Sequence, residues 1–226
     1  MNTFFEGRTS DSPYVKMIWR GGAGSYYAPI CPADGQWNLL FLKRDGSVRV
    51  SVEGPLTKAT PKTHAEGTEW LVIKFQPGAF LPFLPVKNLV DADAVLPLAA
   101  RNSFWLHGSA WQFPDYDNVE TFIDRLVRAD VLRSDPVVST VVLQNSPQEI
   151  SSRTVRRHFL LTTGLTPKTL AQIERAQQAA ALLQQGLPLL DVVYQAGYAD
   201  QSHMTRSLKH FLGQTPAQIA QESKPE

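Results

Sequence analysis

The chain has 226 residues, of which 43% are hydrophobic and 19% are charged, and its formal net charge is +1 at pH 7. This composition predicts a globular protein of two modest domains and excludes a chain that is mainly disordered. Because the sequence has no run of eighteen apolar residues and no secretory signal at its N-terminus, we expect a cytoplasmic protein without a membrane span.

The charges are distributed unevenly along the chain. Residues 1–117 carry 11 basic and 11 acidic side chains, whereas residues 151–226 carry 8 basic and 5 acidic ones. A basic surplus in the last third predicts contact with nucleic acid there, and its small size predicts modest affinity from one chain alone. The single cysteine, Cys31, excludes an internal disulfide and a multi-cysteine zinc site.

The first part of the chain alternates between apolar runs and turns with Pro or Gly, which is typical of short strands. Asp45-Gly46 predicts a hairpin turn, because glycine accepts the positive φ of tight turns. Trp37–Leu42 is apolar almost throughout, so we expect it to be buried on both faces. The predicted strands are Tyr14–Trp19, Trp37–Leu42, Ser47–Glu53 and Glu69–Phe75.

From residue 118 the apolar residues recur three and four positions apart, which predicts helices for the rest of the chain. The first helix is expected at 118–132, with Asp117 as its N-cap. Asp135-Pro136 predicts the start of a second helix, which Ser146-Pro147 ends.

A third helix is expected to begin near Ser151, whose hydroxyl can cap the first turn, and to end at Thr163-Gly164. A long helix follows from about Pro167 to Gln185, and Gly186 stops it. One apolar stripe predicts its buried face: Leu170, Ile173, Ala176, Ala180 and Leu183.

The next segment has the lengths of a helix-turn-helix. Residues 188–195 and Gln201–Leu212 predict two helices, joined by the turn Ala196-Gly197-Tyr198. Gly197 suits this turn because other residues adopt the required backbone conformation only at a cost. A second unit with a longer turn that lacks glycine lies upstream: Val137–Leu143, Gln144–Ile150 and the helix from Ser151.

The last third of the chain contains several short motifs in a fixed order: Ser151–Phe159, Thr163-Gly164-Leu165-Thr166-Pro167, Ala180-Ala181-Leu182-Leu183, Asp191-Val192-Val193, Ala196-Gly197-Tyr198, Asp200–Arg206 and Gly213-Gln214-Thr215-Pro216. With these motifs, residues from about 146 to 220 resemble the DNA-binding domain of the AraC/XylS family of transcription regulators. Two features depart from the family pattern: the first unit lacks the usual spacing between its helices, and Met204 and Leu208 replace frequent phenylalanines.

The resemblance implies an α+β chain of two domains. Residues 1–112 would form a β-barrel-like, cupin-like domain that senses a ligand or mediates dimerisation, and residues 113–226 a helical DNA-binding domain. Its two helix-turn-helix units, at about 135–163 and 188–212, would be joined by a rigid linker helix at 167–185. The two reading helices would then enter successive major-groove segments of double-stranded DNA, about 34 Å apart.

The resemblance also implies which side chains face DNA. Spacing alone supports the candidates on the helix Gln201–Leu212, because Met204, Leu208 and Phe211 should point inward from that helix. Arginine can form two hydrogen bonds with guanine, and glutamine with adenine. The alternative is that some of these side chains are solvated or contact phosphate. Lys168 is at most a phosphate contact, and His203 is expected to have a surface or packing role rather than to sense pH. The predicted DNA-contacting residues are Arg153, Thr154, Arg156, Arg157, Gln201, Ser202, Thr205, Arg206 and Lys209.

The competing interpretation is a metal-binding or enzymatic barrel that carries a DNA-binding domain. His64-Ala65-Glu66 imitates part of a zinc deaminase motif, but the cysteine pair of that motif is absent. Only His64 and His107 lie in the N-terminal half, too few for a His-rich metal site. Gly21-Gly22-Ala23-Gly24 lacks the Lys that follows in a phosphate-binding loop, so we interpret it as a loop between strands. We therefore expect no cofactor, no metal and no enzyme activity, but a regulator with a small-molecule effector that forms a homodimer.

Six aromatic residues of the N-terminal half have two interpretations. They could line a ligand pocket, although aromatic residues at such positions more often belong to the core. These residues are Trp19, Trp37, Phe41, Trp70, Phe75 and Phe80.

Overall fold

The computed structural model describes residues 3–100, 102–144 and 150–221. Ser146-Pro147, the predicted end of the second helix, lies outside these ranges. The chain forms two compact units, each built from separated segments. The domain border expected at 112 stays a prediction, because compactness does not show which segments fold independently. The first unit comprises Met1–Tyr27, Gln36–Pro55 and Thr63–Thr166, and the second comprises Ala28–Gly35, Leu56–Lys62 and Pro167–Glu226.

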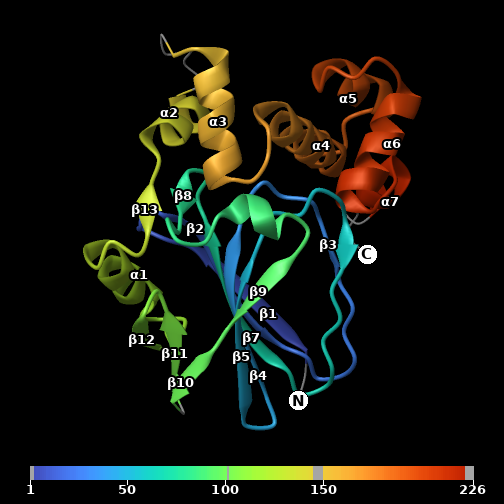
Figure 1. The fold of residues 1–226 in the computed structure, drawn as a ribbon. Helices are drawn as coiled ribbons and strands as arrows, with labels where there is room; N and C mark the ends of the chain where they lie inside the picture. The colour runs from blue at the N-terminus through green and yellow to red at the C-terminus, as the bar shows by residue number, and fades with distance from the viewer. Residues whose placement is uncertain (1–2, 101, 145–149, 222–226) are drawn as a thin grey trace. The chain divides into compact units, whose positions relative to one another are not determined.

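The first unit is built on a sheet of six antiparallel strands in the order β1-β2-β7-β4-β5-β9 (Figure 1). Within the described ranges this sheet is open, with β1 and β9 at its edges. The prediction of a strand-rich N-terminal half and a helical C-terminal half is therefore confirmed, without full closure of the sheet into a barrel. The strands are β1 Phe4–Thr9, β2 Val15–Gly22, β4 Asn38–Arg44, β5 Ser47–Glu53, β7 Glu69–Phe75 and β9 Asp93–Leu96.

All four predicted strands form, as β2, β4, β5 and β7. The hairpin between β4 and β5 turns at Asp45 and Gly46, whose φ angles of 49° and 76° are both positive, as a type I′ turn requires. Leu39, Leu40 and Phe41 are all buried, so β4 is covered on both faces as expected. Strand β1 was not predicted, because its residues are nearly all exposed and so lack the alternation of a half-buried strand.

The interpretation of residues 21–24 as a loop was wrong for two of the four residues. Gly21 and Gly22 lie in β2. A Cβ atom on Gly21 would come within 2.3 Å of the Trp70 ring, and one on Gly22 within 2.6 Å of the Phe4 ring. These glycines therefore allow aromatic rings to lie directly over the strand.

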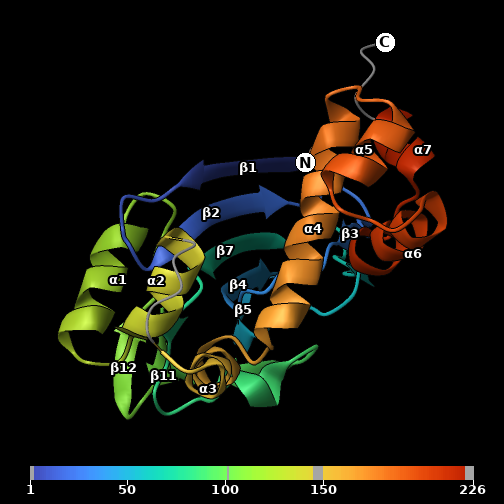
Figure 2. The same ribbon diagram turned by 90° about the horizontal axis from the view of Figure 1, so that it is seen from above.

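Helix α1 and a small three-stranded sheet lie against one face of the large sheet (Figures 1 and 2). The apolar face of α1, including Phe122, Ile123 and Leu126, packs into the same core as Phe41 of β4 and Phe104 of β11. Full burial of one such side chain contributes about 1.5–3 kcal/mol relative to exposure. The elements of this layer are β10 Leu98–Ala100, β11 Ser103–Leu106, β12 Ser109–Gln112 and α1 Val119–Arg128.

The predicted boundaries of α1 were wrong. The N-cap is Asn118 rather than Asp117, and neither side chain caps the helix. The carboxylate of Asp115 instead accepts hydrogen bonds from the Asp117 and Asn118 amides. The helix ends at Arg128, before position 132, because Asp130 turns the backbone at a φ of 60°. The chain then forms β13, Arg133–Ser134, which pairs with β8, Ala79–Phe80.

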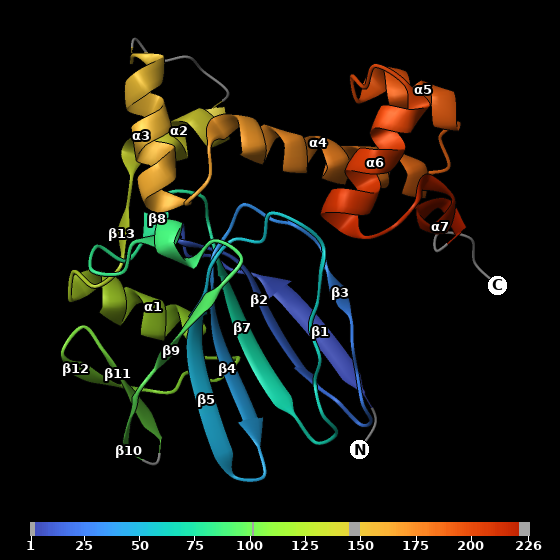
Figure 3. The same ribbon diagram turned by 45° about the vertical axis from the view of Figure 1, so that its right-hand side comes forward.

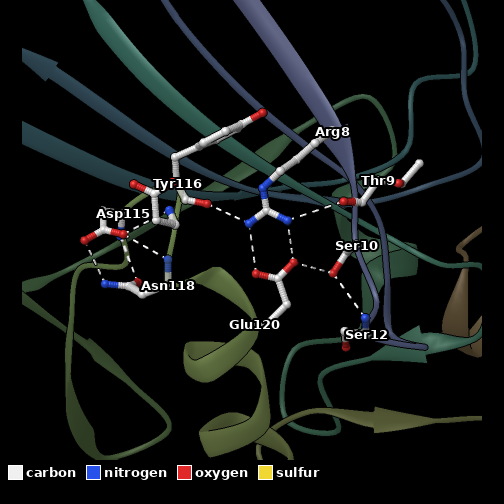
Figure 4. Close-up of polar contacts among 9 residues, drawn as sticks. Arg8, Thr9, Ser10, Ser12, Asp115, Tyr116, Asn118 and Glu120 are labelled. Carbon is white, nitrogen blue, oxygen red and sulfur yellow. Dashed lines mark hydrogen bonds and ion pairs between the residues drawn. The ribbon is translucent and has the colours of Figure 1, made fainter.

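An ion pair holds the first turn of α1 to β1 (Figure 4). The Arg8 guanidinium donates to both carboxylate oxygens of Glu120, at 2.6 and 2.9 Å, and to the Tyr116 carbonyl at 2.7 Å. Ser10 adds a third hydrogen bond to the carboxylate. The hydrogen bond from Arg8 is the main reason that the pKa of Glu120 falls to about 2.

Glu120→Gln removes the charge and leaves a side chain of similar size. We expect the free energy of unfolding at pH 7 to fall by about 1–2 kcal/mol, after allowance for solvent screening of a half-buried pair. The unfolded pKa, 4.5, lies above the folded value of about 2. At pH values between these two pKa values, Glu120 binds a proton in the unfolded chain but not in the folded one. The ion pair therefore contributes its full stability above the unfolded pKa and loses it as the pH falls through the folded pKa.

Denaturant titrations of both proteins at pH 7 and pH 3 measure this effect. Glu66→Gln, on an exposed turn, is the control and should match the parent protein at both values. A difference between the parent and Glu120→Gln that stays the same at pH 3 would exclude the ion pair as its source.

Up to residue 221, the second unit contains four helices, with α5, α6 and α7 packed against α4 (Figure 3). The buried face of α4 is the predicted stripe with one change, because Ala179 is fully buried and Ala180 only half-buried. Both residues continue the helical spacing from Ala176, so periodicity alone could not choose between them. The helices are α4 Pro167–Gln184, α5 Leu189–Gln195, α6 Gln201–Leu212 and α7 Pro216–Gln221.

Two segments from the N-terminal half belong to this unit and hold the end of α6. They contain β3, Ile30–Cys31, and β6, Thr60–Pro61. The Ala33 amide donates to the Phe211 carbonyl at 2.6 Å, and the Ala59 amide donates to the His210 carbonyl at 2.9 Å. Carbonyls in the last turn of a helix have no partner within the helix, so these bonds satisfy groups that would otherwise need water.

Gly213 and Gly186 form a matched pair that measures this contact. Both have a positive φ, 75° and 82°, but a Cβ on Gly213 would lie 2.8 Å from Ile30 Cγ2, whereas one on Gly186 would meet open space. We expect Gly186→Ala to lower the free energy of unfolding by about 1–2 kcal/mol through backbone strain. Gly213→Ala should cost about 1 kcal/mol more, through the contact with Ile30. Equal losses in denaturant titrations would show that Ile30 does not constrain this position.

Candidate DNA interface

Helix α6 has a defined start and end. The Asp200 carboxylate caps its first turn by accepting a hydrogen bond from the His203 amide at 2.6 Å. Gly213 follows its last residue in the left-handed conformation, which glycine adopts without penalty. The helix contains no acidic residue and two fixed cations, Arg206 and Lys209. Its surface is therefore compatible with a polyanion.

Buried anchors orient α6. Met204 and Leu208 are fully buried and Phe211 is nearly so, at spacings of four and three residues that place them on one face. The inward orientation predicted for these three residues is confirmed. The predicted contact residues Gln201, Ser202, Arg206 and Lys209 are exposed.

Thr205 is less available than its neighbours. It is half-buried, and its hydroxyl donates to the Gln201 carbonyl at 2.9 Å within the same helix. This bond uses the one proton of the hydroxyl and leaves its oxygen as an acceptor. Thr205 can therefore accept a hydrogen bond from a base or contact a thymine methyl group, but it has no proton left to donate.

The turn before α6 needs its glycine for backbone reasons alone. Gly197 has a φ of 68°, and a Cβ added there would meet nothing within 4 Å. The Gly197 amide donates to the Tyr194 carbonyl and the Tyr198 amide to the Val193 carbonyl, which is the Schellman pattern at a helix end. The positive φ predicted for Gly197 is confirmed.

Tyr198 connects the turn to α6 and α4, a role that was not predicted from the sequence. Its ring is buried, and its hydroxyl lies 2.9 Å from the Ser207 hydroxyl. Burial is the main reason that the pKa of Tyr198 is raised. The Arg175 guanidinium lies over the ring at 5.7 Å, and the His203 ring meets it edge-on at 5.2 Å. His203 thus has the packing contact that was expected of it.

The upstream helices begin at the predicted caps. Helix α2, Pro136–Gln144, is capped by Asp135, which accepts hydrogen bonds from the Val137 and Val138 amides at 2.9 and 3.2 Å. Helix α3, Ser152–Thr162, is capped by Ser151, which accepts from the Thr154 amide at 3.3 Å.

One side-chain link joins these two helices and was not predicted. The second carboxylate oxygen of Asp135 lies 2.6 Å from His158 Nδ1, so the residue that caps α2 also contacts the middle of α3. Its two partners are 23 residues apart in sequence, and no local pattern marks such a pair. The link orients α3 without using any of its predicted DNA-contacting residues.

Helix α3 exposes a basic face. Arg153, Arg156 and Arg157 are exposed, Thr154 is half-buried, and Phe159 is buried. The helix ends before Gly164, whose φ is 71°, as the sequence predicted. The two predicted contact groups therefore lie on two helices, one in each compact unit, and the expected separation between those helices stays a prediction.

The N-terminal histidines have aromatic neighbours. The His64 ring stacks on Trp70 at 4.7 Å, and the His107 ring stacks on Phe83 at 4.3 Å. Within residues 3–100, 102–144 and 150–221, no group of three His, Cys, Asp or Glu residues is arranged to hold a metal ion. Over the same part of the chain, no helix is long and apolar enough to span a membrane.

The six aromatic residues divide between core and cavity. Trp37 and Phe75 are buried and stacked at 3.8 Å, which is a core arrangement. Phe41 and Trp70 are also buried, but they line a cavity in the first unit. Trp19 and Phe80 are half-buried. The core interpretation therefore holds for Trp37 and Phe75, and the ligand-pocket interpretation of the others stays a prediction.

Part of the helical region is similar to known helix-turn-helix proteins. The family described as "Helix-turn-helix domain" matches residues 149–222. The uncharacterized HTH-type transcriptional regulator YbfI of Bacillus subtilis (strain 168) is 42% identical over 48 residues, which are 21% of this chain and only 18% of that relative. Among solved structures, ToxT from Vibrio cholerae is similar with a TM-score of 0.39 at 11% identity, over 96% of this chain and 97% of that one. A second ToxT structure, from strain O395, has a TM-score of 0.42 at 8% identity, over 98% and 99% of the two chains.

Proposed function

We propose that residues 149–222, which match the family described as "Helix-turn-helix domain", are an AraC-type DNA-binding domain, and that the whole chain is a sequence-specific, DNA-binding transcription regulator. The observation that carries the proposal is α6, whose anchors are buried and whose Gln201, Ser202 and Arg206 are exposed near its N-terminal half. The N-terminal part of a recognition helix is the part that meets base edges in the major groove.

The roles of the side chains on α6 follow from their chemistry. Arg206 can donate two hydrogen bonds to O6 and N7 of a guanine, and Gln201 can pair with an adenine. Ser202 serves a base or a phosphate, and Thr205 accepts only. Lys209, one turn beyond Arg206, is a point charge at the end of the helix and contacts phosphate.

Helix α3 supplies the second set of contacts. Arg153, Arg156 and Arg157 give it more charge than α6 has, and Ser151 orders its first turn. We assign Arg156 to a base, Arg157 to phosphate, and Arg153 and Thr154 to the groove edge. Lys168, which is exposed at the start of α4, is assigned to phosphate.

The N-terminal sheet is assigned to regulation rather than catalysis. A small molecule that binds one conformation of the chain better than another shifts the population that binds DNA. The excess of only three cations in residues 151–226 favours binding by two copies of the chain, because each phosphate contact adds to affinity. The chain would act on DNA in the cytoplasm.

Selection of binding sites from random double-stranded DNA with the full chain tests the proposed function. We expect a motif with two elements whose centres are about one helical turn, roughly 34 Å, apart, because α3 and α6 each read one groove segment. A single short motif would limit base recognition to one helix. Binding without any enriched sequence would overturn the proposal.

Arg206→Ala and Lys209→Ala form a matched pair on one face of α6. Arg206→Ala should relax base preference at one position of the motif and cost about 1–3 kcal/mol on the preferred sequence. Lys209→Ala should weaken binding to all sequences alike and reduce the salt dependence by about one phosphate contact. Titrations of labelled duplexes at two or more salt concentrations measure both. Equal weakening by Arg206→Ala on every sequence would reassign this residue to the DNA backbone.

A further inference from the structure

The first unit contains a cavity of about 340 Å³ on the face of the sheet that α1 covers. Arg20, Leu71 and Phe41 lie directly opposite one another across β2, β7 and β4, so their side chains share one face and form its floor. The segment that joins β12 to α1 contributes Phe113 and Tyr116 to the other wall. The volume lies in the range of small-molecule sites.

The charged side chains that line the cavity already have partners within the protein. Lys43 and Glu69 face each other across β4 and β7 and form an ion pair at 3.5 Å. Arg20 donates to Glu6 at 3.0 Å. The Asp115 carboxylate accepts hydrogen bonds from the amides at the start of α1. A bound anion would face Glu69 and Asp115, and a bound cation would face Arg20 and Lys43, so the lining favours an uncharged ligand.

One donor in the lining lacks an acceptor. Within the described ranges, Arg20 Nε is buried and has no hydrogen-bond partner, although the guanidinium lies 4.3 Å from the centre of the Tyr116 ring. A buried donor without an acceptor costs about 1–3 kcal/mol. A ligand oxygen that accepts this bond would recover that cost, whereas a hydrocarbon of the same shape would not.

We propose that this cavity is the effector site of the regulator and that it binds an uncharged, mainly aromatic molecule through one carbonyl-type oxygen. The aromatic body contacts Leu71, Phe41 and Phe113, and the oxygen accepts from Arg20. The effector role rests on the proposed function, whereas binding to the cavity does not.

The cavity adjoins the contacts that fix the start of α1. Two guanidinium groups lie over the Tyr116 ring, that of Arg20 at 4.3 Å and that of Arg8 at 5.0 Å from the ring centre. Arg8 also holds the Tyr116 carbonyl and the Glu120 carboxylate (Figure 4). A molecule that moves Tyr116 or Arg20 therefore acts on the attachment of α1 to β1, and α1 leads along the chain to α2 and α3.

Benzophenone is the test probe, because it is uncharged, has two rings and one carbonyl oxygen, and forms covalent bonds to nearby C–H groups under ultraviolet light. The full chain is titrated with benzophenone, with diphenylmethane, which lacks the oxygen, and with 4-benzoylbenzoate, which adds a negative charge. Isothermal titration calorimetry measures the binding of each probe. We expect benzophenone to bind at least tenfold more tightly than either analogue, and to crosslink to Phe41, Leu71 or the segment 113–116.

Arg20→Met and Arg49→Met are the matched variants. Both arginines lie on strands of the same sheet and pair with a carboxylate, Arg49 with Asp93 at 2.7 Å, but only Arg20 lines the cavity. Arg20→Met should weaken benzophenone binding at least tenfold, to the level of diphenylmethane, and Arg49→Met should leave it unchanged. The comparison of the three probes on the parent protein does not depend on either variant folding.

Several results would overturn the proposal: no saturable binding of benzophenone, crosslinks confined to other parts of the chain, or tighter binding of 4-benzoylbenzoate. The effector role has its own measurement, the affinity for the selected DNA with and without saturating benzophenone. A change of threefold or more that Arg20→Met abolishes supports it, and an unchanged affinity overturns it. If the chain recognises a DNA sequence but does not bind benzophenone, the cavity proposal fails alone. If it binds the probe but recognises no sequence, the proposed function fails alone.

Discussion

A helix of twelve residues is only marginally stable in water, so α6 depends on what surrounds it. Its apolar side is anchored by Met204, Leu208 and Phe211, its first turn by Asp200, and its last carbonyls by amides from two distant segments. Because the buried side and both ends are fixed by these contacts, the exposed side chains near the start of the helix are not needed to hold it in place. This division leaves Gln201 and Arg206 available for another molecule.

The helices and caps were largely predictable from the sequence because the interactions that define them are local. An N-cap such as Ser151 accepts a hydrogen bond from an amide three residues away, and a glycine such as Gly197 indicates a positive φ at its own position. The same reasoning placed the hairpin at Asp45-Gly46. Asp117 was chosen as a cap by the same rule and was wrong, since the neighbouring Asp115 supplies the carboxylate instead.

The contacts that sequence reasoning could not find join residues far apart in the chain. Arg8 and Glu120 are separated by 112 residues, and Gln177 and Ala33 by 144. The sequence around each residue does not indicate its partner, because many other groups in the chain could make the same contact. The cavity is unpredictable for the same reason: its floor depends on the register of three strands, which the turns constrain only between neighbours. On α6, periodicity predicted the exposure of Gln201, Ser202 and Arg206, whereas the roles of these side chains depend on a partner molecule.

The two segments at 28–35 and 56–62 make the second unit discontinuous. A fragment cut at residue 149, where the helix-turn-helix match begins, would lack the Ala33 and Ala59 amides and would leave the Phe211 and His210 carbonyls to solvent. Ile30, which packs against Gly213, would be missing as well. The part of the chain proposed to contact DNA is thus completed by residues translated before the six-stranded sheet is finished. A fragment that lacks the segments 28–35 and 56–62 would therefore contain an altered α6.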